Sequence, residues 1–208
     1  MSETERTNSL AIFEYLAGIG VTKIFLVPGG GNMFLVDAVG LQGSIEFVAT
    51  HHEQAAVIAA EYYSRETGNL GVALVTTGPG SSNAVTGVAG AWFDSIPLLV
   101  IAGQVKRDDY NHDGRLRQKG PQEISMVSMA ASITKFAKTC LDPETLLDDV
   151  KKAVSEARSG RPGPVILEIP LDVQSMATHK KVASDKCRKS KSRSVNSAVK
   201  TAAGLIAN

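Results

Sequence analysis

Cysteine, tryptophan and long apolar runs are scarce in this sequence. Its 208 residues include one tryptophan and two cysteines, Cys140 and Cys187, which lie far apart. This content excludes a disulfide framework and indicates no cysteine metal site. No apolar run approaches the roughly 20 residues that a membrane-spanning helix needs. The polar start, residues 1–8, lacks the apolar segment of a signal peptide, so we expect a cytoplasmic protein with no membrane partner.

Net charge is also nearly absent, at +1, but the charges are unevenly distributed. Residues 180–208 hold eight of the 22 Lys and Arg residues and one of the 21 acidic residues. No aromatic residue lies between these charges, which disfavours nucleic-acid binding and favours a solvated linker. Hydrophobic residues make up 43% of the chain and charged residues 21%, as in an ordinary globular protein.

The length predicts one domain with an appendage. We assign residues 1–174 to the domain and residues 175–193 to a basic linker. Apolar periodicity resumes in residues 194–208, where Ser194 is a candidate N-cap. We interpret this last segment as the first helix of a further domain.

Short β-branched or apolar runs alternate with helix-like segments between residues 10 and 172. This alternation predicts an α/β fold with an open, doubly wound, six-stranded and mainly parallel sheet that has helices on both faces. Near-continuous apolar runs indicate strands covered on both sides. The expected strands are residues 23–27, 46–49, 71–76, 97–102, 133–138 and 164–169. The expected helices are residues 10–17, 53–65, 83–92, 122–130 and 144–157.

Three turns after the expected strands carry glycine-rich or polar sequences, in residues 28–32, 51–54 and 78–83. Ligands of an open parallel sheet bind outside the carboxyl ends of the strands, so chemistry is expected at these turns. Glycines permit close backbone approach to a ligand and leave amide donors free. Taken singly, the glycines are equally explained by tight turn geometry, and Glu53 by the favourable dipole at a helix start.

Together, these turns resemble one family, the thiamine-diphosphate enzymes of the acetolactate synthase type. The sequence HEQ at residues 52–54 and the helix after it are similar to that family's HEQ helix. TTGPG at residues 76–80, with Asn83, resembles its next turn and helix, and residues 160–174 resemble the segment that closes its pyrimidine-binding domain. The resemblance covers about residues 8–174 and identifies an N-terminal, pyrimidine-binding domain.

The resemblance implies a role for the residues of these turns. In this family the thiazolium carbon of thiamine diphosphate is deprotonated by the cofactor's own exocyclic amine in its imino form, and a carboxyl that shares a proton with the pyrimidine ring promotes that form. Glu53 matches this carboxyl, is expected at the end of a buried strand, and is the expected catalytic residue. His52 and Gln54 are expected to support it, and His51 to be structural. The implied cofactor-binding residues are Pro28, Gly29, Glu53, Pro79, Gly80 and Asn83.

The connection at residues 103–121 is long enough to be a candidate functional loop. It leads to Gln122 and Glu123, which match a Gln-Glu pair that faces the substrate in acetolactate synthase, so Gln122 is the expected substrate-side residue. Pro121 stands where that family has phenylalanine. This departure favours a 2-oxo acid or acceptor other than pyruvate.

The family's diphosphate and Mg²⁺ segment, Gly-Asp-Gly to Asn-Asn, does not occur in the sequence, and no metal ligand is assigned. The resemblance implies that Mg²⁺ and the diphosphate are bound by the diphosphate-binding domain of a neighbouring subunit in a homodimer or homotetramer. By this reasoning the chain alone is catalytically incomplete, and residues 194–208 begin a truncated central domain. A requirement for FAD stays open.

Two alternatives also stay open. The chain could be a natural split subunit that pairs with a separate diphosphate-binding chain. It could also be a non-catalytic, flavodoxin-like binding module, although such a module has no need of the intact Glu53.

Overall fold

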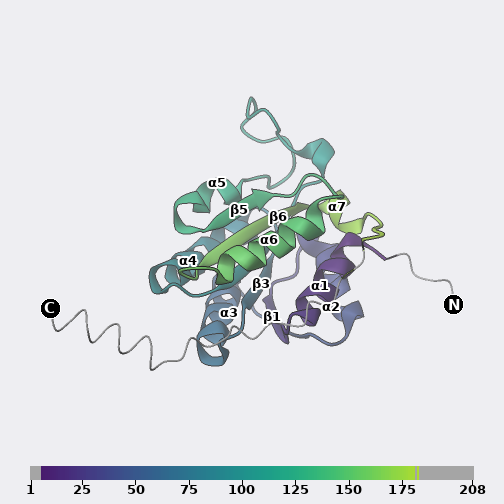
Figure 1. The fold of residues 1–208 in the computed structure, drawn as a ribbon. Helices are drawn as coiled ribbons and strands as arrows, with labels where there is room; N and C mark the ends of the chain where they lie inside the picture. Colours follow the sequence, from purple (N-terminus) through teal and green to yellow (C-terminus); the bar gives the residue numbers. More distant parts are fainter. Residues whose placement is uncertain (1–5, 181, 183–208) are drawn as a thin grey trace, which may run out of the picture.

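A parallel sheet forms the centre of the computed structural model, which describes residues 6–180 and 182 (Figure 1). Within these residues six strands follow the order β2-β1-β3-β4-β6-β5. Every neighbouring pair is parallel, which confirms the predicted open sheet and makes it entirely rather than mainly parallel. The strands are β1 (Lys23–Leu26), β2 (Glu46–Ala49), β3 (Gly71–Val75), β4 (Leu98–Gln104), β5 (Phe136–Thr139) and β6 (Pro164–Pro170).

Helices connect the strands, as βαβ units require, because a parallel strand can be reached only by a crossover. The helices of the described residues are α1 (Asn8–Gly18), α2 (Met33–Gln42), α3 (Glu53–Thr67), α4 (Pro79–Asp94), α5 (Met126–Ala130), α6 (Leu146–Arg158) and α7 (Leu171–Ser175). Short 3₁₀ turns are η1 (Gly30–Asn32), η2 (Arg107–Asp109) and η3 (Ala131–Ile133). The loop after β4 extends away from the rest of the domain, at the top of Figure 1.

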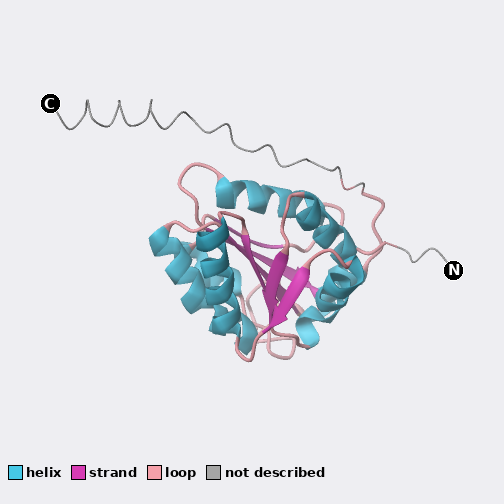
Figure 2. Cartoon of the chain, turned by 90° about the horizontal axis from the view of Figure 1, so that it is seen from below, coloured by secondary structure: helices cyan, strands magenta, loops and turns pink. Residues whose placement is uncertain are grey.

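Two hydrophobic cores lie on opposite faces of the sheet, and Figure 2 shows helices on both sides of it. Successive side chains of a strand point to opposite faces, so Val72 packs in one core and Ala73 in the other. Helices α1, α2, α6 and α7 cover the first face, and α3, α4 and α5 cover the second. All residues of β3, β4 and β6 are buried, as their apolar sequences predict.

The strand before Glu53 differs from the prediction. β2 was expected to be buried, but it lies at the edge of the sheet, and three of its four residues are exposed. An edge strand has a neighbour on one side only, here β1. Its sequence, EFVA, is short and alternates weakly, so its position in the sheet could not be inferred from it.

Several helix boundaries also differ from the prediction. The helix expected at residues 122–130 begins only at Met126, because Gln122 has a φ of 60°, which an α-helix cannot accommodate. The strand expected at residues 133–138 is displaced to 136–139. α2 and α7 were not predicted. α2 buries only Leu35, Ala38 and Val39, and the glycine-rich turn that precedes it gave no clear signal for a helix start.

The predicted linker and further helix fall largely outside the described residues, because residues 183–208 are not among them. The described part of the linker lies beside the start of α1, where the Thr178 amide donates to the Arg6 carbonyl at 2.8 Å. The proposed boundary at residue 174 stays a prediction.

The strand order brings the turn after β1, the turn after β3 and the end of β4 together. The chain leaves β1 for β2 on one side and returns to β3 on the other, so the turns after β1 and β3 form a topological switch point. The turn after β1 also packs on the end of β4. A Cβ atom at Gly103 would lie less than 3.0 Å from the Gly31 carbonyl and the Asn32 nitrogen. Glycine at 103 therefore allows η1 to reach its position.

Replacing Gly103 by alanine should disturb this contact, because both opposing atoms belong to the backbone and cannot rotate away. We expect Gly103→Ala to lower the free energy of unfolding by about 1–3 kcal/mol, measured by urea denaturation. Gly18→Ala is the control, since nothing lies within 4 Å of a Cβ there. Equal stability of the two variants would show that η1 is not held by this close approach.

Candidate functional site

Glu53 is the first residue of α3, directly after β2. His52 caps this helix, because its Nδ1 accepts a hydrogen bond from the Gln54 backbone N–H at 3.2 Å. The half-buried Glu53 carboxylate accepts a hydrogen bond at Oε2 from the Asn83 side-chain amide, at 3.0 Å. Within the described part of the chain Oε1 has no hydrogen-bond partner. One carboxylate oxygen is therefore oriented and the other is available to a ligand.

The turn after β3 brings Gly80 beside this carboxylate. Gly78 has a φ of 64°, which favours glycine, and Pro79 then occupies the first position of α4, where its missing N–H costs nothing. A Cβ at Gly80 would lie 2.6 Å from Thr76 Cγ2 and 3.3 Å from Glu53 Oε1. The structure thus brings Glu53, Gly80 and Asn83 together, while Pro79 is exposed on the same turn.

The turn after β1 meets the same threonine. A Cβ at Gly29 would lie 2.7 Å from the Thr76 side chain, and the Gly31 N–H donates to Thr76 Oγ1 at 3.0 Å. The buried Asn32 holds the turn closed, because its side chain accepts from the Gly29 N–H at 2.8 Å. Pro28 is exposed at the start of this turn. Thr76, which links the two turns, was not among the predicted site residues.

The substrate-side candidate Gln122 lies against the turn after β3. Its Cβ and carbonyl oxygen lie 2.7 Å from where a Cβ of Gly78 would be, and its carbonyl accepts from Thr77 Oγ1 at 3.4 Å. No hydrogen bond joins it to Glu53 within the described residues. It lines a cavity of about 230 Å³ together with Gly30, Gly31, Thr77, Gln104, Val105, Lys106, Asp109, Pro121 and Leu171.

Two buried polar residues at this cavity were not predicted to have a role: Gln104, which lines it, and Glu168, a single acid in the otherwise apolar strand PVILEIP. Both are fully buried and hydrogen-bonded to each other, Nε2 to Oε1, at 3.3 Å. A charged residue inside an apolar strand is the sequence signal that could have indicated them, because burial of an unpaired acid is costly.

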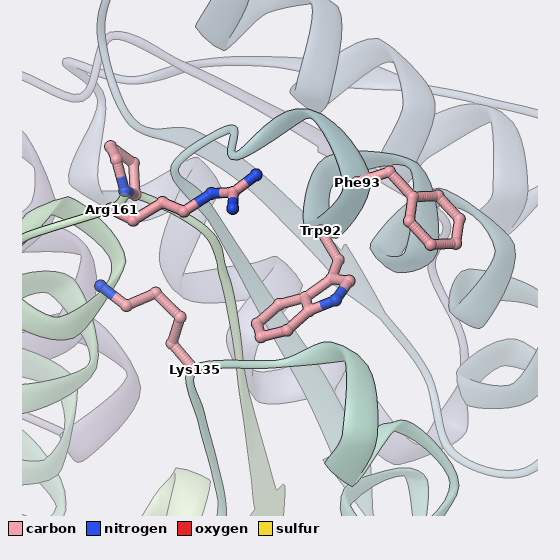
Figure 3. A pocket seen from close by; sticks show the side chains of 5 residues that line it. Trp92, Phe93, Lys135 and Arg161 are labelled. Carbon is pink, nitrogen blue, oxygen red and sulfur yellow. The ribbon is translucent and has the colours of Figure 1, made fainter.

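A larger cavity, of about 420 Å³, lies elsewhere in the molecule. Figure 3 shows Lys135 and Arg161 on one side of it and the indole of Trp92 on the other, with Phe93 turned away. These residues precede β5 and β6 or end α4, so the cavity lies at the edge of the sheet opposite the glycine turns. It contains no carboxylate, and we assign the candidate site to the carboxyl edge, where Glu53 lies.

The described residues contain no group of three or more His, Cys, Asp or Glu side chains that could hold a metal ion. None of their helices is both long enough and apolar enough to cross a membrane.

The fold and these turns define a doubly wound α/β domain with a half-buried carboxylate at the carboxyl edge of its sheet. Residues 6–129 match the family described as "Thiamine pyrophosphate enzyme, N-terminal TPP binding domain". The chain belongs to this family and carries the N-terminal domain of its acetolactate synthase-like members. Thiamine pyrophosphate is another name for thiamine diphosphate, so the resemblance noted in the sequence is confirmed.

Curated relatives of the chain include acetolactate synthases. The chain is 41% identical over 158 residues to the isozyme 3 large subunit of Escherichia coli strain K12, covering 76% of this chain and 26% of that protein. It is 41% identical over 169 residues to chloroplastic acetolactate synthase 2 of Nicotiana tabacum, covering 81% and 24%. The chloroplastic enzyme of Arabidopsis thaliana is 39% identical over 163 residues. The chain therefore spans about a quarter of the length of these relatives.

Glu123, next to Gln122, connects distant parts of the loop after β4 by hydrogen bonds. Its Oε1 accepts from the Asn111 N–H at 2.6 Å, and its Oε2 accepts from the N–H groups of Lys119 and Gly120 at 2.8 and 3.1 Å. Partial burial opposes ionisation, but the three backbone donors and the Lys119 charge outweigh it, so the pKa of Glu123 lies below its ordinary value. The ionised carboxylate thus stabilises the folded loop.

The loop should accordingly lose stability in acid. A carboxyl with a lowered pKa in the folded state contributes stability above its unfolded pKa, and this contribution is lost as the pH falls through the folded pKa. We expect Glu123→Gln to lower the free energy of unfolding by about 1 kcal/mol at pH 7, because solvent screens these charge-assisted bonds. The difference from wild type should shrink from about pH 5 downward in urea titrations. A difference that is constant from pH 7 to pH 3, or an equal one in the exposed control Glu144→Gln, would contradict this role.

Proposed function

We propose that this domain binds the aminopyrimidine ring of thiamine diphosphate at the carboxyl edge of its sheet, with Glu53 as the catalytic carboxyl. The observation that carries the proposal is the Glu53 side chain, with Oε2 held by Asn83 at 3.0 Å and Oε1 available to a ligand. The family match supports the identity of the cofactor.

The residues around Glu53 fit a flat ring that carries nitrogen atoms. A Cβ at Gly80 would approach Glu53 Oε1 to 3.3 Å and occupy space beside the carboxylate. A glycine there leaves the carboxylate accessible to the edge of a ring. In this proposal Pro28 and Gly29 line the ring from the turn after β1, and Pro79, Gly80 and Asn83 line it from the turn after β3.

When bound, thiamine diphosphate supplies an acidic thiazolium carbon that can add to the carbonyl group of a 2-oxo acid. Residues of this chain would orient the cofactor and promote the loss of its thiazolium proton. Glu53 would hold the aminopyrimidine ring through Oε1 and would share a proton with a ring nitrogen, the interaction that would make the cofactor's exocyclic amine basic. Asn83 keeps the carboxyl in one orientation by donating to Oε2, and His52 fixes the first turn of the helix on which Glu53 sits.

We further propose that the chain needs a second domain for catalysis. The sequence lacks the family's Gly-Asp-Gly to Asn-Asn segment, and the chain spans about a quarter of its relatives' length. A diphosphate-binding domain of a neighbouring subunit, in a homodimer or homotetramer, would supply Mg²⁺ and the diphosphate site. The cytoplasmic location, the metal and the assembly stay predictions, and FAD stays open.

A split subunit would contain the same site, and the geometry of Glu53 does not favour one gene arrangement over the other. The non-catalytic module is disfavoured by a specific contact. A module that only binds a ligand would have no use for a half-buried carboxylate whose one oxygen is held by Asn83 and whose other oxygen is left without a partner among the described residues.

Replacing Glu53 by glutamine tests the proposed chemistry, because glutamine keeps an acceptor for Asn83 but cannot share a proton with the ring. In the complete enzyme, with the diphosphate-binding domain present, we expect exchange of the thiazolium proton to slow by roughly 10² to 10⁴. The measurement is hydrogen–deuterium exchange of the bound cofactor, quenched in acid and read by NMR. Glu66→Gln, near the other end of α3, should exchange at the wild-type rate. Equal rates for Glu53→Gln and wild type would remove Glu53 from the mechanism.

The substrate class that we propose is a 2-oxo acid larger or more polar than pyruvate. Pro121 lines the 230 Å³ cavity with Gln122, in the place of the phenylalanine of acetolactate synthase. A proline presents less surface than a phenyl ring and deletes an amide donor, so the cavity should accept a larger group.

Competition between 2-oxo acids tests this substrate preference. In the complete enzyme, kcat/KM for pyruvate should be lower than for a larger 2-oxo acid by roughly 10- to 200-fold, the range for about one methylene group in a pocket. Pro121→Phe should shift the preference towards pyruvate. If pyruvate is the best substrate by tenfold or more, Pro121 has no influence on the substrate class.

A further inference from the structure

A carboxyl group that the proposed chemistry does not use is buried beneath the substrate-side loop. Glu168 on β6 is fully buried. Its Oε1 accepts the Met126 backbone N–H at 2.7 Å, and its Oε2 is 2.7 Å from Thr139 Oγ1. Met126 begins α5, directly after the loop that carries Gln122. Glu168 therefore fixes the end of this loop to β6, the strand between β4 and the edge strand β5.

Gln104, at the end of β4, continues this network towards the cofactor turn. Its Nε2 donates to the Ile124 carbonyl at 2.7 Å and to Glu168 at 3.3 Å. Its Oε1 accepts from Thr77 Oγ1 at 3.0 Å. Each side-chain polar atom of Gln104 thus has a partner, and those partners come from the loop, from β6 and from the turn after β3.

Between these anchors Gln122 adopts an unusual backbone conformation. Its φ of 60° is a left-handed value that is unfavourable for a non-glycine residue and persists only where its surroundings enforce it. Two residues after Gln122 the loop is held at Ile124, and the carbonyl oxygen of Gln122 lies 3.4 Å from Thr77 Oγ1. The same threonine hydroxyl contacts Gln104.

We propose that Glu168 and Gln104 are positioning residues that hold Gln122 against the turn at Thr77 and Gly78, and so set the place of the substrate-side amide. Glu168 is not among the residues that line the 230 Å³ cavity; Gln104 lines it, and the role proposed for Gln104 runs through its hydrogen bonds with Ile124 and Thr77. The inference rests on the proposed function in one respect, the assignment of Gln122 to the substrate. The hydrogen-bond network itself is independent of that assignment.

The hydrogen-bond pattern makes glutamine a suitable replacement for Glu168. Burial raises the pKa of Glu168, although hydrogen bonds from Thr139, Met126 and Gln104 oppose the shift. A carboxamide keeps an oxygen that can accept the N–H groups of Met126 and Gln104, and it places an NH₂ group against the Thr139 hydroxyl, which can accept as well as donate. Leucine has a similar volume and offers neither group. If Glu168→Gln behaves as wild type and Glu168→Leu does not, the loop is positioned by the hydrogen bonds of residue 168 and not by its packing.

The first experiment measures amide hydrogen exchange by NMR in the 208-residue chain. The diagnostic amides are those of Lys119, Gly120 and Glu123, which are bonded within the loop and do not touch Glu168. We expect Glu168→Leu to speed their exchange at least tenfold relative to the β3 amides. Glu168→Gln should stay within threefold of wild type.

A second variant keeps the test decisive if Glu168→Leu fails to fold. Gln104→Met is neutral and of similar length, and it removes the donor to Ile124, so it should speed the same amides at least tenfold. The matched control is Glu61→Leu, which removes another buried carboxyl, on α3, whose Oε1 is 2.5 Å from Arg65 Nη2. The control should not speed exchange of the loop relative to β3.

The second experiment measures steady-state kinetics with a 2-oxo acid in the complete enzyme. We expect Glu168→Leu to raise KM at least fivefold with a smaller change in kcat, and Glu168→Gln to restore KM. The proposal is overturned if the loop amides of both Glu168→Leu and Gln104→Met exchange as in wild type, or if KM rises no more than in Glu61→Leu. Failure of the proposed function has a different signature, absence of thiazolium proton exchange in the unaltered enzyme.

Discussion

Close approach of the turns at the carboxyl edge is the constraint on which the candidate site depends. The turns after β1 and β3 and the end of β4 are so near one another that a Cβ atom at Gly29 would lie 2.7 Å from the Thr76 side chain, and one at Gly103 would lie less than 3.0 Å from the backbone of the turn after β1. Thr76 fills the space that remains and contacts the first two turns. Because interiors are packed as densely as organic crystals, no side chain could be added there without moving a turn. Glu53 is joined to the turn after β3 through its hydrogen bond with Asn83 and lies beside Gly80.

Three carboxylates near this edge differ in their partners, and the partners decide what each can do. Glu168 is fully buried and all of its contacts are to the protein, so it can only hold structure. Both carboxylate oxygens of Glu123 accept hydrogen bonds from backbone N–H groups of its own loop. Glu53 alone of the three has one oxygen fixed and one without a partner among the described residues. Among these acids it is the one suited to exchange a proton with a ligand.

The order of strands and helices was largely predictable. Buried parallel strands have continuous apolar sequences, and in this chain they alternate with segments of helical periodicity. The errors occurred where the local sequence is ambiguous. EFVA is too short to reveal that β2 lies at the sheet edge, and the glycine-rich turn before Met33 concealed the start of α2. The helix at residues 122–130 failed for a tertiary reason, since Gln122 is held at a positive φ by its contact with the turn after β3.

The sequence by itself determined the family and the residue types of the site, because glycines, an acid and an amide at fixed spacings identify turns that follow strands. It determined that Glu53 and Asn83 lie on different elements, but the 3.0 Å bond between them depends on how α3 and α4 pack on one face of the sheet. Only the tertiary structure decided that Thr76 joins two turns and that Glu168 lies beneath the loop. These contacts join residues that are tens of positions apart, and no local pattern records which distant partner a buried polar group will have.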